Sequence, residues 1–136
     1  MKPISKVDAA DQIRPCWFID LDWYQQNNRS FLVLAQGCLC PKCYQRLKES
    51  EVSVEELLAA IKDCCSDTPD FINNKLPILE SIFRLFLANG NQPLAVEEIG
   101  EQLREWRSGD TYRTSNEVLT RLLEHDQCYG LRQVQE

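Results

Sequence analysis

Apolar side chains recur every three or four positions along the second half of this chain, which is the spacing of an amphipathic helix. The pattern predicts three helices, over residues 76–89, 95–107 and about 112–126. The first is apolar on nearly every face, with Pro77 in its first turn and Gly90 after its end. A helix of this kind should lie at the centre of the core, and we expect its buried side chains to include Leu79, Ile82, Phe83 and Phe86.

The first half of the chain shows one clear helix start and one apolar run. Ser53 and Glu56 have the spacing of a capping box, so a helix should begin there. Residues 31–35 are all apolar, and we interpret them as a short buried strand. Together with the aromatic segment before it, this run predicts a hairpin over residues 17–35. The tail at residues 128–134 also has strand-like residues. The fold class should therefore be mainly α (α+β).

Composition places the chain among ordinary globular proteins. Its 136 residues are 43% hydrophobic, and no apolar run approaches the roughly 20 residues that a membrane span needs. The start of the chain has no apolar signal core, so we expect a cytoplasmic protein. The net charge of -6 disfavours binding to nucleic acid or membrane through bulk charge. With one histidine, no glycine-rich phosphate loop and no carboxylate constellation, we expect neither an enzyme nor a small-molecule substrate.

Cysteine is the residue type that stands out, because the chain has seven of them. In a reducing cytoplasm, clustered cysteines indicate a metal or iron–sulfur site rather than a disulfide framework. Cys38, Cys40 and Cys43 share one short segment, and the spacing of the last two allows both thiolates to bind one ion. Cys64 and Cys65 fall at the end of the helix predicted after Ser53, so they are the other candidate ligands.

Three interpretations of this cluster remain open. Three cysteines in one loop and one distant cysteine suit an iron–sulfur cluster, held by Cys38, Cys40 and Cys43 with Cys64 or Cys65. We favour this cofactor over zinc, because adjacent thiols on one helix diverge by about 100° and rarely bind the same ion. In the third interpretation no metal binds, and the cysteines are small apolar side chains in the core.

The cysteines also divide the chain. Six of the seven lie in residues 1–66, and only Cys128 lies in residues 67–136. The segment between these parts contains a proline and helix-capping polar residues, which is a composition typical of a joint. We therefore predict a cysteine-cluster metal-binding module over residues 1–66 and a second, helical domain over residues 67–136.

The second domain has a pattern of its own in residues 91–103 and 111–126. The first segment has a Pro-Leu pair that leads into an acidic turn, and then Gly100, a small residue where two helices could cross. The second segment supplies one more helix before a short β tail. Over roughly residues 76–134 the chain resembles a winged helix-turn-helix domain with a very short wing. This resemblance implies a C-terminal winged-helix domain.

In winged-helix members that bind DNA, the third helix enters the major groove. The resemblance therefore implies a contact surface on the outward face of that helix, formed by Arg113, Asn116, Thr120 and Arg121. Glu117 and Glu124 share this face, and a DNA-binding module usually has a basic footprint. We therefore favour a protein partner for this face, with DNA as the other candidate.

The functional hypothesis combines the two units. We expect an accessory or adaptor protein that binds zinc or an iron–sulfur cluster and docks on a larger protein machine, such as a transcription or redox complex. The alternative is a DNA-binding transcription regulator that responds to redox state or iron. Fold resemblance alone does not decide between these two roles.

Overall fold

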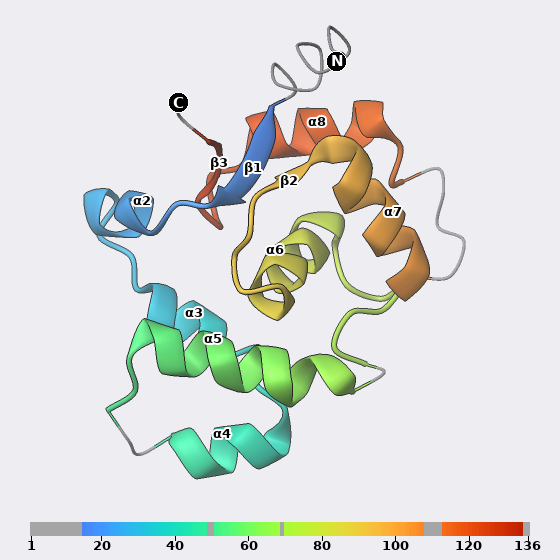
Figure 1. Ribbon diagram of the computed structural model, residues 1–136. Helices are drawn as coiled ribbons and strands as arrows, with labels where there is room; N and C mark the ends of the chain where they lie inside the picture. The colour runs from blue at the N-terminus through green and yellow to red at the C-terminus, as the bar shows by residue number, and fades with distance from the viewer. Residues whose placement is uncertain (1–14, 49–50, 69, 108–112, 135–136) are drawn as a thin grey trace, which may run out of the picture.

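The computed structural model describes residues 15–48, 51–68, 70–107 and 113–134 (Figure 1). The elements in chain order are β1 (Cys16–Ile19), α2 (Leu21–Gln26), α3 (Phe31–Gln36), α4 (Pro41–Leu47), α5 (Val54–Asp63), the 3-10 turn η1 (Cys65–Asp67), α6 (Ile78–Ala88), β2 (Leu94–Ala95), α7 (Val96–Trp106), α8 (Asn116–Glu124) and β3 (Leu131–Gln133). Helices dominate, and the three short strands form one sheet. The predicted fold class, mainly α (α+β), is confirmed.

Strand β1 is the middle strand of the sheet, whose order is β2-β1-β3. Both of its neighbours are antiparallel to it, with Trp17 opposite Leu94 on one side and opposite Gln133 on the other. Asn91 extends this pairing, because its side chain accepts a hydrogen bond from the Ile19 amide and donates one to the Ile19 carbonyl. The first of the described strands is therefore held by segments that lie more than seventy positions later in the chain.

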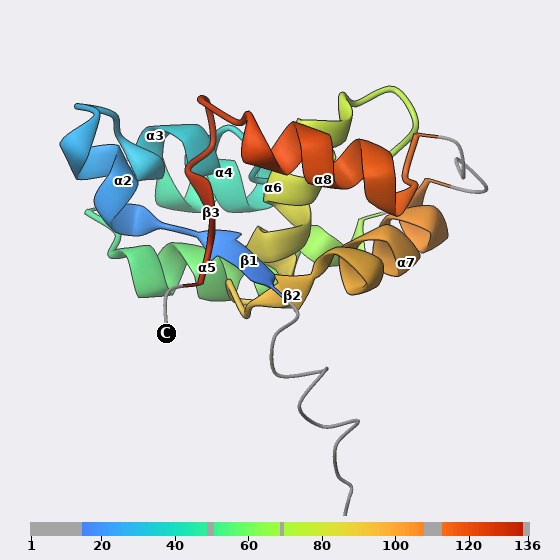
Figure 2. The ribbon, with the colours of Figure 1, turned by 90° about the horizontal axis from the view of Figure 1, so that it is seen from above.

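Helix α6 lies at the centre of the molecule in both ribbon views (Figure 1, Figure 2). Ile82, Phe83 and Phe86 are fully buried, which confirms the prediction of a central helix. Leu79 was also expected in the core, but it lies in the first turn of the helix and is only half-buried at the edge of the core. Because one hydrophobic cluster contains residues from both sides of position 66, the predicted division there does not coincide with a break in the core.

The predicted strand at 31–35 and the predicted hairpin over 17–35 are both wrong. Residues 17–19 do belong to strand β1, but its partners are β2 and β3, and most of the remaining region forms helices α2 and α3. Ser30 is the N-cap of α3, where its side chain accepts a hydrogen bond from the amide of Val33. Phe31 and Ala35 are buried one helical turn apart, whereas Val33 is 68% exposed. An apolar run this short has the same appearance in a strand and in a helix, so the capping serine was the more informative residue.

Serine residues cap the starts of helices α5 and α8. At α5, Ser53 and Glu56 form both hydrogen bonds of a capping box, as predicted. The three helices predicted in the second half correspond to α6, α7 and α8, with ends that differ by a few residues. Helix α8 begins after Ser115, which caps it, and Tyr112, where its start was predicted, lies outside the described residues.

A buried cation joins the end of α7 to the segment that precedes α6. The guanidinium group of Arg107 is fully buried and donates hydrogen bonds to the carbonyls of Asn73 and Leu76 and to the hydroxyl of Ser81. Hydrogen bonds of this kind are the condition under which a charged side chain tolerates burial. Arg107 therefore fixes the path of the chain into the central helix.

The turn from α8 back to β3 is organised by Asp126 and closes against α2. The Asp126 carboxylate is buried and accepts hydrogen bonds from the amides of Cys128, Tyr129 and Leu131. Gly130 has a φ of +69°, and a Cβ atom there would lie 2.8 Å from a ring carbon of Tyr24. Both the backbone conformation and the lack of space therefore favour glycine at this position.

Gly130→Ala should destabilise the protein more than Gly90→Ala does. Both glycines have a positive φ, so each substitution carries a backbone cost of about 1–2 kcal/mol. Nothing lies within 4 Å of a Cβ at Gly90, whereas Gly130 lies against Tyr24, so its variant should lose about 1–3 kcal/mol more through overpacking. Urea unfolding of both variants measures the difference. Equal losses of unfolding free energy in the two variants would show that Tyr24 in α2 moves away from the added methyl group at no energetic cost.

Candidate metal centre

Two of the clustered cysteines lie in the first turn of helix α4. Cys40 is the N-cap residue in an extended conformation, Pro41 follows in the first turn, and Cys43 lies three residues after the cap. Proline suits this position because it has no amide hydrogen to leave unpaired. Residues three apart at a helix start lie on the same side, so both thiols face the same neighbour.

The other two cysteines lie where helix α5 ends. The helix stops at Asp63, Cys64 takes the C-cap position, and Cys65 begins the turn η1. The backbone at Cys64 has φ -130° and ψ -59°, which is not helical, so the two neighbouring thiols do not belong to one continuous helix. The expected divergence of adjacent thiols on a helix therefore does not apply to this pair.

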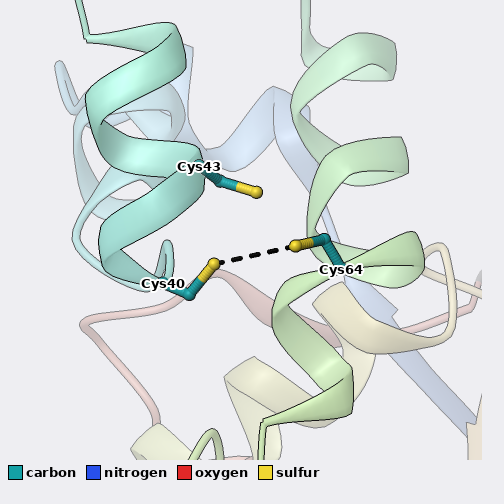
Figure 3. Close-up of side chains that lie close together, drawn as sticks. All are labelled: Cys40, Cys43 and Cys64. Carbon is teal, nitrogen blue, oxygen red and sulfur yellow. Dashed lines mark hydrogen bonds between the residues drawn. The ribbon is translucent and has the colours of Figure 1, made fainter.

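The two segments bring four cysteines together. The sulfur atoms of Cys40, Cys43 and Cys64 all lie within 4.8 Å of one another, and those of Cys40 and Cys64 are 3.8 Å apart (Figure 3). The sulfur of Cys65 accepts a hydrogen bond of 3.2 Å from the amide of Cys40, which places it beside the same group. Four thiols gathered in this way form a donor set compatible with a metal ion or an iron–sulfur cluster.

Cys38 is the one predicted ligand that does not join this group. Its thiol is buried and donates a long hydrogen bond of 3.9 Å to the carbonyl of Leu34, in the preceding helix α3. Burial raises the pKa of this thiol to about 11, so it favours the neutral form. The turn that leads out of α3 directs Cys38 into the core, and the structure brings together four of the five predicted ligands.

The surroundings of the four thiols affect them differently. The backbone amide of Cys43 stabilises the thiolate of Cys40 and lowers its pKa to about 7. Burial raises the pKa of Cys65 to about 12, and hydrogen bonds with Cys43 and Cys40 raise that of Cys64 to about 11. A bound cation would have to displace the protons of these two thiols, so metal affinity should rise with pH.

One further side chain of the site was not predicted from the sequence. A nitrogen atom of the Arg46 guanidinium group lies 3.7 Å from the sulfur of Cys43 and donates to it. A cation beside a thiolate ligand partly neutralises the negative charge of a metal–thiolate group. The only sequence signal for this role is the three-residue spacing from Cys43 on the same helix.

The predicted partner surface lies elsewhere in the structure. Asn116, Thr120 and Arg121 belong to helix α8 and border a shallow hollow on its outer face, and Arg113 is exposed shortly before the helix begins. Helices α8 and α4 lie at opposite ends of the molecule (Figure 1). The four clustered thiols and the predicted contact residues therefore lie at separate places in the structure.

Comparison with protein-family models, curated proteins and solved structures gives no match for this chain. Its described helices are all too short or too polar to cross a membrane. The function of the chain is therefore inferred from the four cysteines and from the distances between them.

Replacing Cys40 or Cys43 by serine should remove bound metal and lower the melting temperature. Each variant loses one thiolate, and the free energy of metal binding contributes to folding because the unfolded chain has no preformed site. Cys128→Ser is the matched control, because Cys128 is exposed and lies outside the group. Metal analysis and thermal unfolding measure both effects. Full metal content in Cys40→Ser and Cys43→Ser would contradict the assignment of these ligands.

Proposed function

We propose that Cys40, Cys43, Cys64 and Cys65 bind one zinc ion. With zinc–sulfur bonds of about 2.3 Å, two sulfurs of a tetrahedral site stand about 3.8 Å apart. The sulfurs of Cys40 and Cys64 have this separation, 3.8 Å, although they come from different helices. This contact is the observation that carries the proposal, because it matches ligands that share a single ion.

The geometry also favours zinc over the iron–sulfur cluster expected from the sequence. That expectation depended on three ligands from one loop, and Cys38 lies apart from the group. In an iron–sulfur cubane each cysteine binds a different iron atom, so the ligand sulfurs stand farther apart than ligands on one ion. The 3.8 Å contact between Cys40 and Cys64 supports a mononuclear site.

The ion would act as a structural cross-link. Cys43 is the one buried residue of helix α4, whose remaining side chains are exposed or half-buried. Hydrophobic contacts therefore contribute little to holding this helix in place. A zinc ion between its first turn and the end of α5 would supply the missing attachment, and the guanidinium group of Arg46 would offset part of the charge of four thiolates.

Metal analysis of the protein purified without oxygen tests the zinc proposal. We expect one equivalent of zinc, no iron, and no absorption band in the visible range, because zinc has a filled d shell. A strong chelator should remove the ion and lower the melting temperature. Stoichiometric iron with inorganic sulfide would contradict the proposal and favour an iron–sulfur cluster, whereas iron without sulfide would indicate a mononuclear iron site.

We also propose a role in binding, as an adaptor that docks on a protein partner through helix α8. Three features support the winged-helix resemblance that underlies this role. The order of elements, α6, β2, α7, α8 and β3, agrees with that of a winged helix. Gly100 lies where space is tight, because a Cβ atom there would be 3.0 Å from the carbonyl oxygen of Thr114, just before α8. The outer face of α8 is polar and exposed, and it contains both charge signs.

The charge of the protein favours a protein partner over DNA. Glu117 and Glu124 border the same hollow as Arg121, and the whole chain has a net charge of -6. Both carboxylates would face phosphate groups in a DNA complex, where like charges repel. A protein surface of mixed charge could pair with both signs on this face.

The charge reversal Arg121→Glu should weaken partner capture. Lys62→Glu is the matched control, because it makes the same change of charge on an exposed position of helix α5. Cross-linking in the cells that contain the protein, followed by mass spectrometry, should recover a partner with the wild type and with Lys62→Glu but less with Arg121→Glu. Selection from random DNA duplexes should enrich no sequence. An enriched sequence would favour the DNA-binding alternative.

A further inference from the structure

The four thiols of the proposed zinc site differ in how far solvent reaches them. Cys43 and Cys65 are buried, with 1% and 0% of their surface exposed. Cys40 and Cys64 are half-buried, and they are the pair whose sulfur atoms are in contact at 3.8 Å (Figure 3). The two cysteines with solvent-exposed surface are therefore also the two whose sulfur atoms are in contact.

Each of these two cysteines borders a hollow in the surface. Cys64 lines one between helices α4 and α5, together with Arg46 and Asp63. Cys40 lines another, together with Thr68 and Arg84. Both hollows are open to solvent and include charged or polar side chains, so a small molecule such as hydrogen peroxide can approach the pair from the surface.

We propose that an oxidant of the peroxide class joins Cys40 to Cys64 in a disulfide and thereby releases the zinc ion. This inference rests on the proposed zinc site and adds a mode of regulation to it. The site would then report the redox state of its surroundings, because two of its four ligands are lost when they are oxidised.

The reaction balances with peroxide as the only oxidant. The thiolate of Cys40 attacks one peroxide oxygen, so a sulfur–oxygen bond forms, the oxygen–oxygen bond breaks, and hydroxide leaves. The thiolate of Cys64 then attacks the sulfur of the sulfenic acid; the disulfide forms and a second hydroxide leaves. Two electrons pass from the two thiolates to peroxide, and solvent protons convert both hydroxides to water. Zinc departs, and the thiolates of Cys43 and Cys65 take up protons.

The structure favours this pair over the two cysteines of α4. The sulfur of Cys43 is buried and accepts a hydrogen bond from Arg46, so it is the less accessible partner for Cys40. Disulfide formation between Cys40 and Cys64 requires their sulfurs to approach from 3.8 Å to about 2.0 Å. The new bond would join the same two elements as the ion did, so α4 would remain attached to the end of α5.

Treatment of the zinc-loaded full chain with hydrogen peroxide tests this inference. A chromogenic chelator should detect one zinc ion released for each disulfide formed, and dithiothreitol should restore zinc binding. Trypsin cleaves after Lys42 and so places Cys40 and Cys43 on different peptides. Mass spectrometry should then find Cys40 linked to Cys64, with fragmentation separating Cys64 from its neighbour Cys65.

Two variants provide the controls. Cys128→Ser should behave as the wild type, because the exposed thiol of Cys128 lies outside the group. Cys64→His keeps a zinc ligand but cannot form the disulfide, so it should retain its zinc over the time in which the wild type loses it.

The outcomes separate the two proposals. A protein that never binds zinc would contradict the proposed function and this inference together. If zinc binds but peroxide neither releases it nor forms a disulfide, the zinc site stands and the inference is wrong. A link between Cys40 and Cys43, or zinc loss from Cys64→His at the wild-type rate, would also overturn the assigned pair.

Discussion

The pairing of β1 with β2 and β3 is the constraint on which the arrangement of the chain depends. It brings residues 16–19 between two strands that lie more than seventy positions later in the sequence. The side chain of Asn91 reinforces it with two hydrogen bonds to Ile19, and Tyr24 adds another through its hydroxyl group, which donates to the carbonyl of Tyr129. After β1 the chain passes through α2 to α3, where Phe31 packs edge-on against Phe83 of the central helix α6, and the cysteine segment follows directly after α3.

The attachment of helix α4 follows a different principle. The rest of the molecule is held by one hydrophobic cluster, to which α4 contributes one buried residue, Cys43. At this edge of the fold, apolar packing is sparse and the four clustered thiols are the main point of contact between α4 and α5. A short helix of seven residues gains little stability on its own, so under the zinc proposal its position would depend on the ion that its cysteines bind.

Much of the helical framework could be predicted from the sequence, because α5 to α8 have clear periodicity and serines cap α5 and α8. The segments at 21–26 and 31–36 could not, since their apolar residues are too few to distinguish a strand from a helix. In the site, the Cys40 and Cys43 pair was predictable from its spacing alone. Two features of the site could not be predicted. Cys38 lies apart because of where the chain turns at the end of α3. Cys64 and Cys65 both join the group because α5 ends at Asp63.

The position of the proposed zinc site also limits how the ion could influence the rest of the molecule. Helix α8, with the proposed contact surface, lies at the opposite end of the structure, and the buried helix α6 stands between the two (Figure 1). Removal of the ion by a chelator, with no disulfide formed, would release α4 first, because its attachment does not involve the sheet or the Arg107 hydrogen bonds. Because local stability follows local contacts, the core around α6 should persist when α4 is released. Oxidation would keep α4 attached through the disulfide between Cys40 and Cys64, so its effect should be confined to the surface formed by α4 and α5, and α8 should keep its shape.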